Sequence, residues 1–220
     1  MNKLYTYVIR CDTGLAPNPF WGCCTLAVCT PNHQGSRVER GDWIVGFLDK
    51  QHGYKFLYAM EVRERIHRSD YFKDAKFSDK KPQVHGSYMQ QCGDNFYSLD
   101  AQGCWRQHET VFHKGIAPNG LTYLEWDTRK PWVFVAKRFW YLGREAQPIP
   151  DHFAPLAGGR GARHNHNPCV VDQFKLWVER NFKEGITALP RDMDAPDDPA
   201  SSGARGNACD GPKSPRGCSR

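Results

Sequence analysis

The sequence lacks the spaced cysteine and histidine pairs of a structural zinc site. Its nine cysteines include no C-x-x-C pair, and no H-x-x-x-H spacing lies near them. A free cysteine packs as a small hydrophobe, so we expect most of these side chains to be buried. This expectation applies to Cys23, Cys24, Cys29, Cys92, Cys104 and Cys169. The sequence therefore predicts no metal and no other cofactor.

Apolar runs of membrane-spanning length are also missing. No stretch approaches the roughly 18 apolar residues that a transmembrane helix needs. The N-terminal string MNKLYTYVIRCD has neither a long apolar core nor a small-residue cleavage site, so it does not resemble a secretory signal. We expect a soluble chain in the reducing cytoplasm, without a membrane partner.

The glycine motifs of common nucleotide-binding and hydrolase sites are absent. Neither G-x-G-x-x-G nor G-x-x-x-x-G-K-[ST] occurs at a strand–helix junction, and there is no G-x-S-x-G. The GGRGAR string at residues 158–163 follows no strand, and the H-N-H string at 164–166 binds a metal only from an extended segment. We interpret residues 157–168 as a mobile basic loop.

Length and charge indicate one domain with mildly basic character. The chain has 220 residues, a formal charge of +6 and a pI near 8.8. A polyanionic partner is favoured, although the charge is below that of a dedicated DNA-binding domain. Residues 190–220 contain no aromatic residue and consist mainly of Pro, Gly, Ser, Ala and balanced charge. The sequence predicts a domain over 1–189 and a disordered tail over 190–220.

Hydrophobic patterning predicts a β-rich α+β fold. Alternating and β-branched runs indicate strands, glycine-containing turns indicate hairpins, and apolar residues at three- and four-residue steps indicate a helix. The expected elements are strands over 4–10, 43–47 and 55–66, a short strand or turn over 24–29, a helix or ordered loop over 69–82, a second hairpin within 121–141, and a helix over 170–182. A small β-barrel with capping helices is the predicted architecture.

The segment from Arg10 to Pro31 is the strongest candidate for a binding surface, with a structural Ω-loop as the alternative. Arg10 and Asp12 are two positions apart and would share one face of a strand. Asn18 lies between two prolines, which restrict its backbone, and an oriented amide can read a base edge. Aromatic residues such as Phe20, Trp21 and Trp43 could stack on a base, although each also suits an aromatic core.

Several strings resemble the nucleotide modification associated domain 2 family. They are YVIRCDTGLAPNPFWGCCTLAVCTP, GDWIVG, LYAMEV, GDNFY and FWYLG, which are spread over residues 4–182. The resemblance implies an association with phage and bacterial systems that modify DNA bases. The GDW strand and the strand that follows it are also similar, more weakly, to PUA-like barrels that bind modified bases.

Two functions from different classes follow. The first is a module that recognises a nucleobase or nucleotide, modified or unmodified, in DNA or free, and that works beside DNA-modification enzymes. Its predicted binding residues are Arg10, Asp12, Asn18, Phe20, Trp21, Trp43, Asp94 and Asn95. The alternative is an enzyme that processes a base or nucleotide. In that case Asp12 or Asp94 serves as acid–base and His113 or His164 assists. A scaffold for modification proteins is a further alternative.

Overall fold

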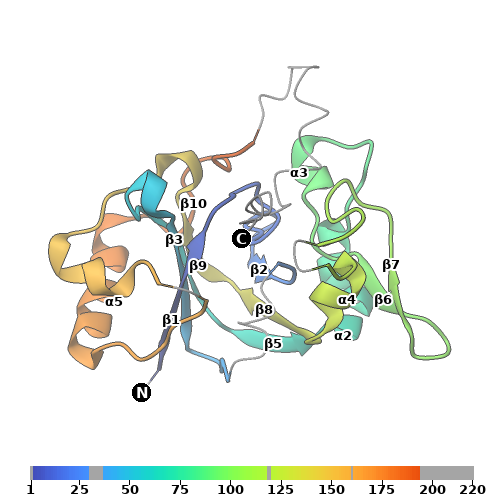
Figure 1. Cartoon of the computed structure of the whole chain (residues 1–220), viewed down its shortest axis with the longest axis horizontal. Coiled ribbons are helices and arrows are strands. Elements are labelled where there is room, and N and C mark those ends of the chain that lie inside the picture. The colour runs from blue at the N-terminus through green and yellow to red at the C-terminus, as the bar shows by residue number, and fades with distance from the viewer. Residues whose placement is uncertain (1, 30–36, 118–119, 160, 194–220) are drawn as a thin grey trace, which may run out of the picture.

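The computed structural model describes residues 2–29, 37–117, 120–159 and 161–193. Its centre is a five-stranded sheet, which Figure 1 shows nearly edge-on. The strand order is β1 (Leu4–Ile9), β3 (Trp43–Leu48), β4 (Phe56–Glu61), β9 (Arg138–Tyr141) and β10 (Gly185–Ile186). The pairs β1–β3 and β9–β10 are parallel, and the other two pairs are antiparallel.

A three-stranded antiparallel sheet lies beside it. The order is β2 (Cys24–Leu26), β8 (Trp132–Ala136) and β5 (Glu64–His67). The chain passes from the five-stranded to the three-stranded sheet between β4 and β5, and returns between β8 and β9. A small hairpin of β6 (Tyr97–Leu99) and β7 (Trp105–Gln107) extends from the far side (Figure 1).

Helices cover the outer faces of both sheets. On the five-stranded sheet lie α5 (Pro168–Asn181) and the 3-10 helix η4 (Asp151–Leu156), whose Phe174 and Phe153 pack into the core there. On the other side lie α2 (Arg68–Lys73), η2 (Ala75–Lys80), α3 (Tyr88–Gln91) and α4 (Tyr123–Thr128). Two short 3-10 turns, η1 (Lys50–His52) and η3 (Gly143–Glu145), follow β3 and β9. Buried side chains form three clusters, one outside each sheet and one between them.

The prediction of a closed barrel is wrong for the described residues. The fold is mixed α+β, as expected, but its strands form separate open sheets in which β1 and β10 are edges. The chain changes sheets at Arg63 and at Lys137, so β5 and β8 pair with each other rather than continuing the five-stranded sheet. The PUA-like similarity therefore receives no support from this architecture.

Local predictions are confirmed where one element is formed from one continuous pattern. Strands at 4–9, 24–26 and 43–48 and the helix at 168–181 agree with expectation. The strand predicted over 55–66 is instead two strands in two sheets. The predicted hairpin within 121–141 is instead helix α4 followed by β8 and β9, which belong to different sheets. Alternation along a chain does not show which sheet each strand joins.

Two segments predicted to be mobile or disordered make specific contacts. The backbone of Arg163 exchanges hydrogen bonds with Thr6, and His164 stacks on Tyr5, so the histidine-bearing loop borders β1. Residues 190–193 contact the segment that begins at Arg10, through hydrogen bonds to Asp12. The domain boundary at 189 remains a prediction. Residues 30–31, 160 and 194–220 of the predicted loops and tail lie outside the described residues.

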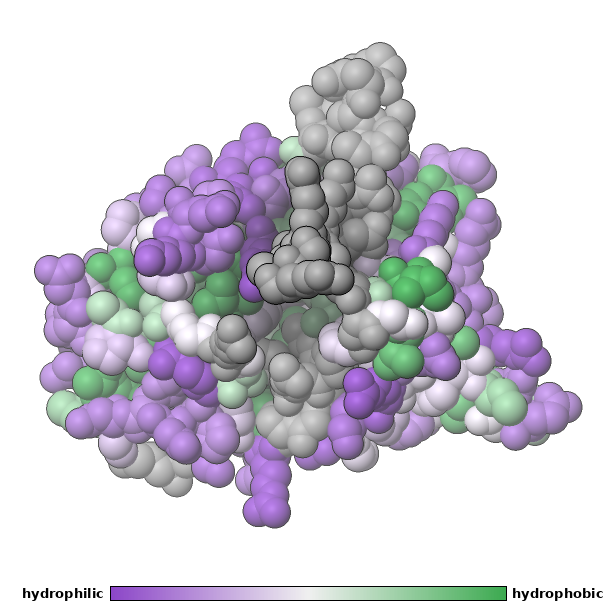
Figure 2. All heavy atoms as spheres, viewed as in Figure 1, coloured by the Kyte–Doolittle hydropathy of each residue, from purple (hydrophilic) through white to green (hydrophobic). Residues whose placement is uncertain are grey.

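Exposed apolar surface is limited on the visible face. Figure 2 shows mainly hydrophilic residues there, with hydrophobic ones in small separate areas. Across the described part of the chain, no helix is both long enough and apolar enough to cross a membrane.

Candidate active site

A cysteine, a histidine and an aspartate meet at one end of the three-stranded sheet. Cys29 comes three residues after the end of β2, and its Sγ atom lies 2.8 Å from Nε2 of His113. His113 follows the β6–β7 hairpin, and its Nδ1 lies 2.5 Å from Oδ2 of Asp127 in α4. The side chains are thus connected in the order sulfur, imidazole, carboxylate, which is the arrangement of a nucleophile, a base and the group that orients the base.

Asp127 contacts both Cys29 and His113. Its Oδ1 accepts the backbone N–H of Cys29 at 2.9 Å, and its Oδ2 accepts the hydroxyl of Tyr97 at 2.9 Å. A carboxylate that accepts these hydrogen bonds also accepts the Nδ1–H of His113. The remaining ring nitrogen, Nε2, therefore faces the sulfur. The carboxylate sets both the tautomer of the base and the position of the cysteine backbone.

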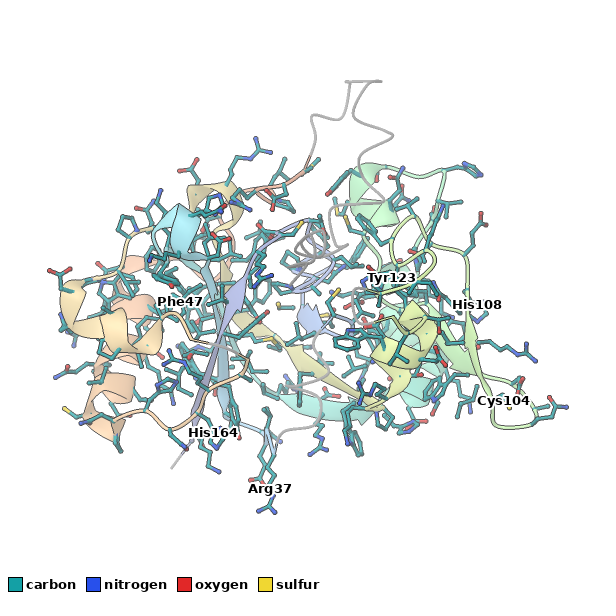
Figure 3. All side chains as sticks on the ribbon, in the orientation of Figure 1. Arg37, Phe47, Cys104, His108, Tyr123 and His164 are labelled. Carbon is teal, nitrogen blue, oxygen red and sulfur yellow. The ribbon has the colours of Figure 1, made fainter. Side chains whose placement is uncertain are left out.

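The imidazole is held by stacking as well as by hydrogen bonds. The rings of His113 and Tyr123 are stacked with centroids 4.2 Å apart, and the edge of Phe96 approaches at 5.9 Å. Figure 3 labels Tyr123 beside α4, on the side of the molecule remote from α5. Gln107 Nε2 donates to the His113 carbonyl at 3.0 Å. His113 is buried while Cys29 is only partly buried, so the sulfur is the most accessible member of the site.

The local electrostatics keep the carboxylate ionised. Burial alone would raise the pKa of Asp127, but the charges of His113 and Arg68 and the Cys29 N–H hold this pKa below its ordinary value. Arg68 is itself buried, and its Nη2 donates to the Asp127 carbonyl at 2.9 Å. Burial lowers the pKa of Arg68 and Asp127 opposes the shift. Arg68 is therefore a second buried cation that, after His113, stabilises the ionised carboxylate.

The backbone is strained at both reacting residues. Cys29 has φ of 63° and His113 has φ of 56°, in the left-handed region that non-glycine residues rarely adopt. Among the described residues only Trp21 and Tyr54 share this property without being glycine. Each such residue costs on the order of 1–3 kcal/mol, and such residues cluster at functional sites. Strain at two contacting residues therefore favours a functional role for the pair.

A second buried carboxylate, that of Asp12, lies in the segment between β1 and β2. Asp12 accepts a 2.5 Å hydrogen bond from the Tyr141 hydroxyl and a 2.9 Å one from the Arg191 backbone N–H. Its own N–H donates to Asp192 Oδ2 at 2.6 Å. Burial raises the pKa of Asp12 to about 6, against these hydrogen bonds. Arg10 is exposed, and no ion pair joins it to Asp12 among the described contacts.

The chain matches a known protein family over most of its length. Residues 1–197 match the nucleotide modification associated domain 2. The chain belongs to that family. No curated protein and no solved structure matches the chain. Membership supports a role associated with nucleotide modification and leaves the specific activity to be inferred from this chain.

In this member of the nucleotide modification associated domain 2 family, several predicted binding residues bond to the protein itself. Asn18 donates to the Cys92 carbonyl at 2.7 Å, and its Oδ1 accepts from Lys80 Nζ at 2.8 Å. Asp94 accepts from the hydroxyls of Thr25 and Tyr71, each at 2.6 Å. These groups are buried together on the outer side of the three-stranded sheet.

The remaining predicted residues are distributed over both sides of the fold. Trp43 is buried outside the five-stranded sheet, stacked on Trp140 with centroids 4.8 Å apart, and Phe20 belongs to the cluster outside the other sheet. Trp21 is partly buried, with Lys80 Nζ 5.7 Å from its ring centre. Asn95 is buried and donates to the Tyr71 and Phe77 carbonyls. These eight residues do not form one pocket lining in the described structure, and their role in binding remains a prediction.

Two residues of the cysteine site were not selected from the sequence. The sequence predicts an assisting role for His113 and a buried hydrophobic role for most of the cysteines, Cys29 among them, and it gives Asp127 no role. The expectation of burial is confirmed for Cys24 and Cys92, whereas Cys104 and Cys169 are exposed and Cys23 and Cys29 are partly buried. The only sequence signal was a cysteine in an irregular segment, because the three residues lie far apart in the chain. In the described part of the chain no group of His, Cys, Asp and Glu side chains has a metal-holding geometry.

Proposed function

We propose that the protein is an enzyme of nucleotide modification that forms a transient bond between Cys29 and its substrate. The contact of Cys29 with His113, oriented by Asp127, is the observation that carries this proposal. Membership of a family associated with nucleotide modification supports a nucleobase or nucleotide as the substrate class. A thiol is a weak nucleophile until a neighbouring base removes its proton, and His113 is placed to do so.

The proposed reaction involves no net oxidation or reduction. The Sγ proton of Cys29 moves to Nε2 of His113, and a sulfur electron pair forms a bond to an electrophilic carbon. The electron pair of the π bond at that carbon moves to its neighbouring atom. The π bond then re-forms as a leaving group departs from that carbon with the proton of the imidazolium. Water next adds to the same carbon and gives a proton to His113. As the S–C bond breaks, the imidazolium returns this proton to the sulfur, which restores the thiol and leaves a hydroxyl group on the substrate carbon. Asp127 stays ionised throughout and stabilises the imidazolium.

The test is an intact-mass and product screen with nucleotides and oligonucleotides. We expect conversion, or a covalent adduct, with the wild-type protein and neither with Cys29→Ser or His113→Asn. Cys104→Ser is the matched control, because Cys104 is an exposed cysteine near the β6–β7 turn, away from the site (Figure 3). Equal activity in the Cys29→Ser and Cys104→Ser variants would exclude covalent catalysis by Cys29.

A recognition module without turnover is the second candidate. It is favoured by the exposed Arg10, which lines an open hollow of about 900 Å³ together with Lys50 and Tyr54. A guanidinium and an ammonium beside an aromatic ring suit a phosphate and a base. This function predicts saturable nucleotide binding that Arg10→Ala weakens and Cys29→Ser does not. Binding that survives Arg10→Ala unchanged would remove this support.

A further inference from the structure

One cation and three aromatic rings contact one another near one end of the three-stranded sheet. We call this set the cation–aromatic strip and define it as Arg65 and His67 of β5, Trp132 of β8 and Trp105 of β7. The Arg65 guanidinium lies 4.1 Å from the centre of the Trp132 ring. The His67 ring meets the Trp132 ring edge-on at 5.9 Å and stacks on Trp105 at 6.0 Å. Arg65 is exposed, and the three rings are each partly exposed.

Strand register places the β5 and β8 members of the strip at the same end of the three-stranded sheet as Cys29. Arg65 pairs with Phe134 of the cluster between the sheets, and Cys29 packs against the cluster on the other face, so the two meet only around this end of the sheet. In the three-stranded sheet β2 and β5 both run antiparallel to β8, so the ends of β2 and β5 lie near the start of β8. His67 pairs with Trp132, and Leu26 pairs with Phe134 two residues further along β8. Cys29 follows Leu26 by three residues, so the chain leaves β2 toward the Trp132 end.

The helix that supplies Asp127 carries another pair of a cation and a ring. Trp126 is partly exposed in α4, and the guanidinium of Arg129 lies 5.9 Å from the centre of its ring. A further stack lies beside α2, where Lys81 is 4.1 Å from the centre of the Phe72 ring and Phe72 stacks on His108 at 4.6 Å. Figure 1 shows α2, α4 and the β6–β7 hairpin together on the side opposite α5. The pairing of a cation with a ring is thus repeated on this side of the molecule.

We infer that the cation–aromatic strip binds a single-stranded nucleic acid and leads one of its bases to Cys29. This inference rests on the proposed function and specifies its substrate as a polymer. Partly exposed rings offer stacking surfaces for bases of any sequence, and the adjacent guanidinium of Arg65 neutralises a phosphate. In a duplex the base faces are already stacked, so the rings favour an unpaired strand. The net charge of +6 agrees with a polyanionic ligand.

Binding of a labelled single-stranded oligonucleotide, followed by fluorescence anisotropy, tests the strip. We expect Trp132→Ala to weaken binding at least fivefold, because stacking is worth about 1–3 kcal/mol per base. Arg65→Ala should lower the affinity and also reduce the slope of log K against log salt by about 0.7. Arg180→Ala is the matched control, since Arg180 is an exposed arginine of α5 on the opposite side of the molecule. Circular dichroism melts verify that each variant folds, and Trp132→Phe, which keeps a stacking ring, should retain most of the affinity.

Each outcome decides for or against the strip. Equal losses in Arg65→Ala and Arg180→Ala would show an effect of overall charge and overturn the inference. A duplex of the same sequence that binds as tightly, or a nucleoside monophosphate that competes at equal concentration, would overturn the single-strand ligand. If Trp132→Ala binds normally while Cys29→Ser abolishes turnover, the strip fails and the cysteine mechanism stands. If the strip variants lose binding while Cys29→Ser retains turnover, the cysteine mechanism fails and the binding role of the strip stands.

Discussion

The Nε2 atom of His113 lies 2.8 Å from the Sγ atom of Cys29, across 84 positions of sequence. The two residues are brought together by Asp127, which accepts hydrogen bonds from the side chain of one and the backbone of the other. Because Asp127 binds both the backbone N–H of Cys29 and the imidazole of His113, it positions the thiol and the imidazole for proton transfer. The fold also holds two further buried polar clusters, one around Asp12 and one around Lys80.

Cys29 should be alkylated faster by iodoacetamide than the more exposed Cys104. Near pH 6.5 we expect at least a tenfold ratio, because His113 accepts the thiol proton as the sulfur reacts. His113→Asn should reduce the rate at Cys29 by about tenfold and leave the rate at Cys104 unchanged. The measurement is peptide mass spectrometry after timed labelling. Equal rates at both cysteines in the wild-type protein would contradict assistance by His113.

Asp12 should make the stability of the protein depend on pH below neutrality. Burial raises its pKa from 3.8 to about 6, so the folded state retains the proton that the unfolded state has lost. The stabilisation is complete below about pH 3.8 and is lost as the pH rises through about 6. At about 1.4 kcal/mol per pH unit, the wild-type protein should lose about 3 kcal/mol relative to Asp12→Asn between pH 4 and pH 7.

Urea unfolding at several pH values measures this difference. The neighbours that face Asp12 are Tyr141, Asp192 and Arg191, and their hydrogen bonds and charges are part of the predicted shift. Asp172→Asn, an exposed change on α5, is the control and should follow the wild-type curve. A pH dependence that is the same in the wild-type protein and in Asp12→Asn would exclude Asp12 as the responsible group.

Lys80 should be needed for folding stability rather than for ligand binding. Its Nζ donates to the Asn18 carbonyl and side chain and to the Cys23 carbonyl, all within 3.0 Å. Lys80→Met would leave these oxygens and the nearby charge of Asp94 uncompensated. We expect a loss of about 3–5 kcal/mol, the usual cost of removing one partner from a buried charge cluster.

The control for Lys80 is the exposed Lys76, whose replacement by Met should change stability by less than about 1 kcal/mol. Asp94→Asn in the Lys80→Met background should recover part of the loss, since it removes the unpaired charge. A Lys80→Met protein with normal stability but lost nucleotide binding would instead support the prediction that Asn18 and Asp94 form a ligand site.

Local sequence patterns are enough to predict the family, the mixed α+β class and those elements whose pattern is continuous. The helix at 168–181 follows from apolar residues at three- and four-residue steps, and the strand at 43–48 from a β-branched and aromatic run after a turn. The family was recognisable because its motifs are contiguous strings. The helix, the strand and the family motifs each depend on residues that are close together in the chain, so the local sequence is enough to predict them.

The division of the strands between sheets, and the contacts between polar residues, depend on residues that are far apart in the chain. The change of sheet at Arg63 and Lys137 depends on pairing with strands that are distant in the chain. The Asn18 side chain accepts a hydrogen bond from Lys80 instead of facing a ligand. Cys29, His113 and Asp127 come from three separate segments, and no short-range spacing connects them. Long-range contacts are chosen by the packing of the whole chain, which is why the candidate active site became visible only in the fold.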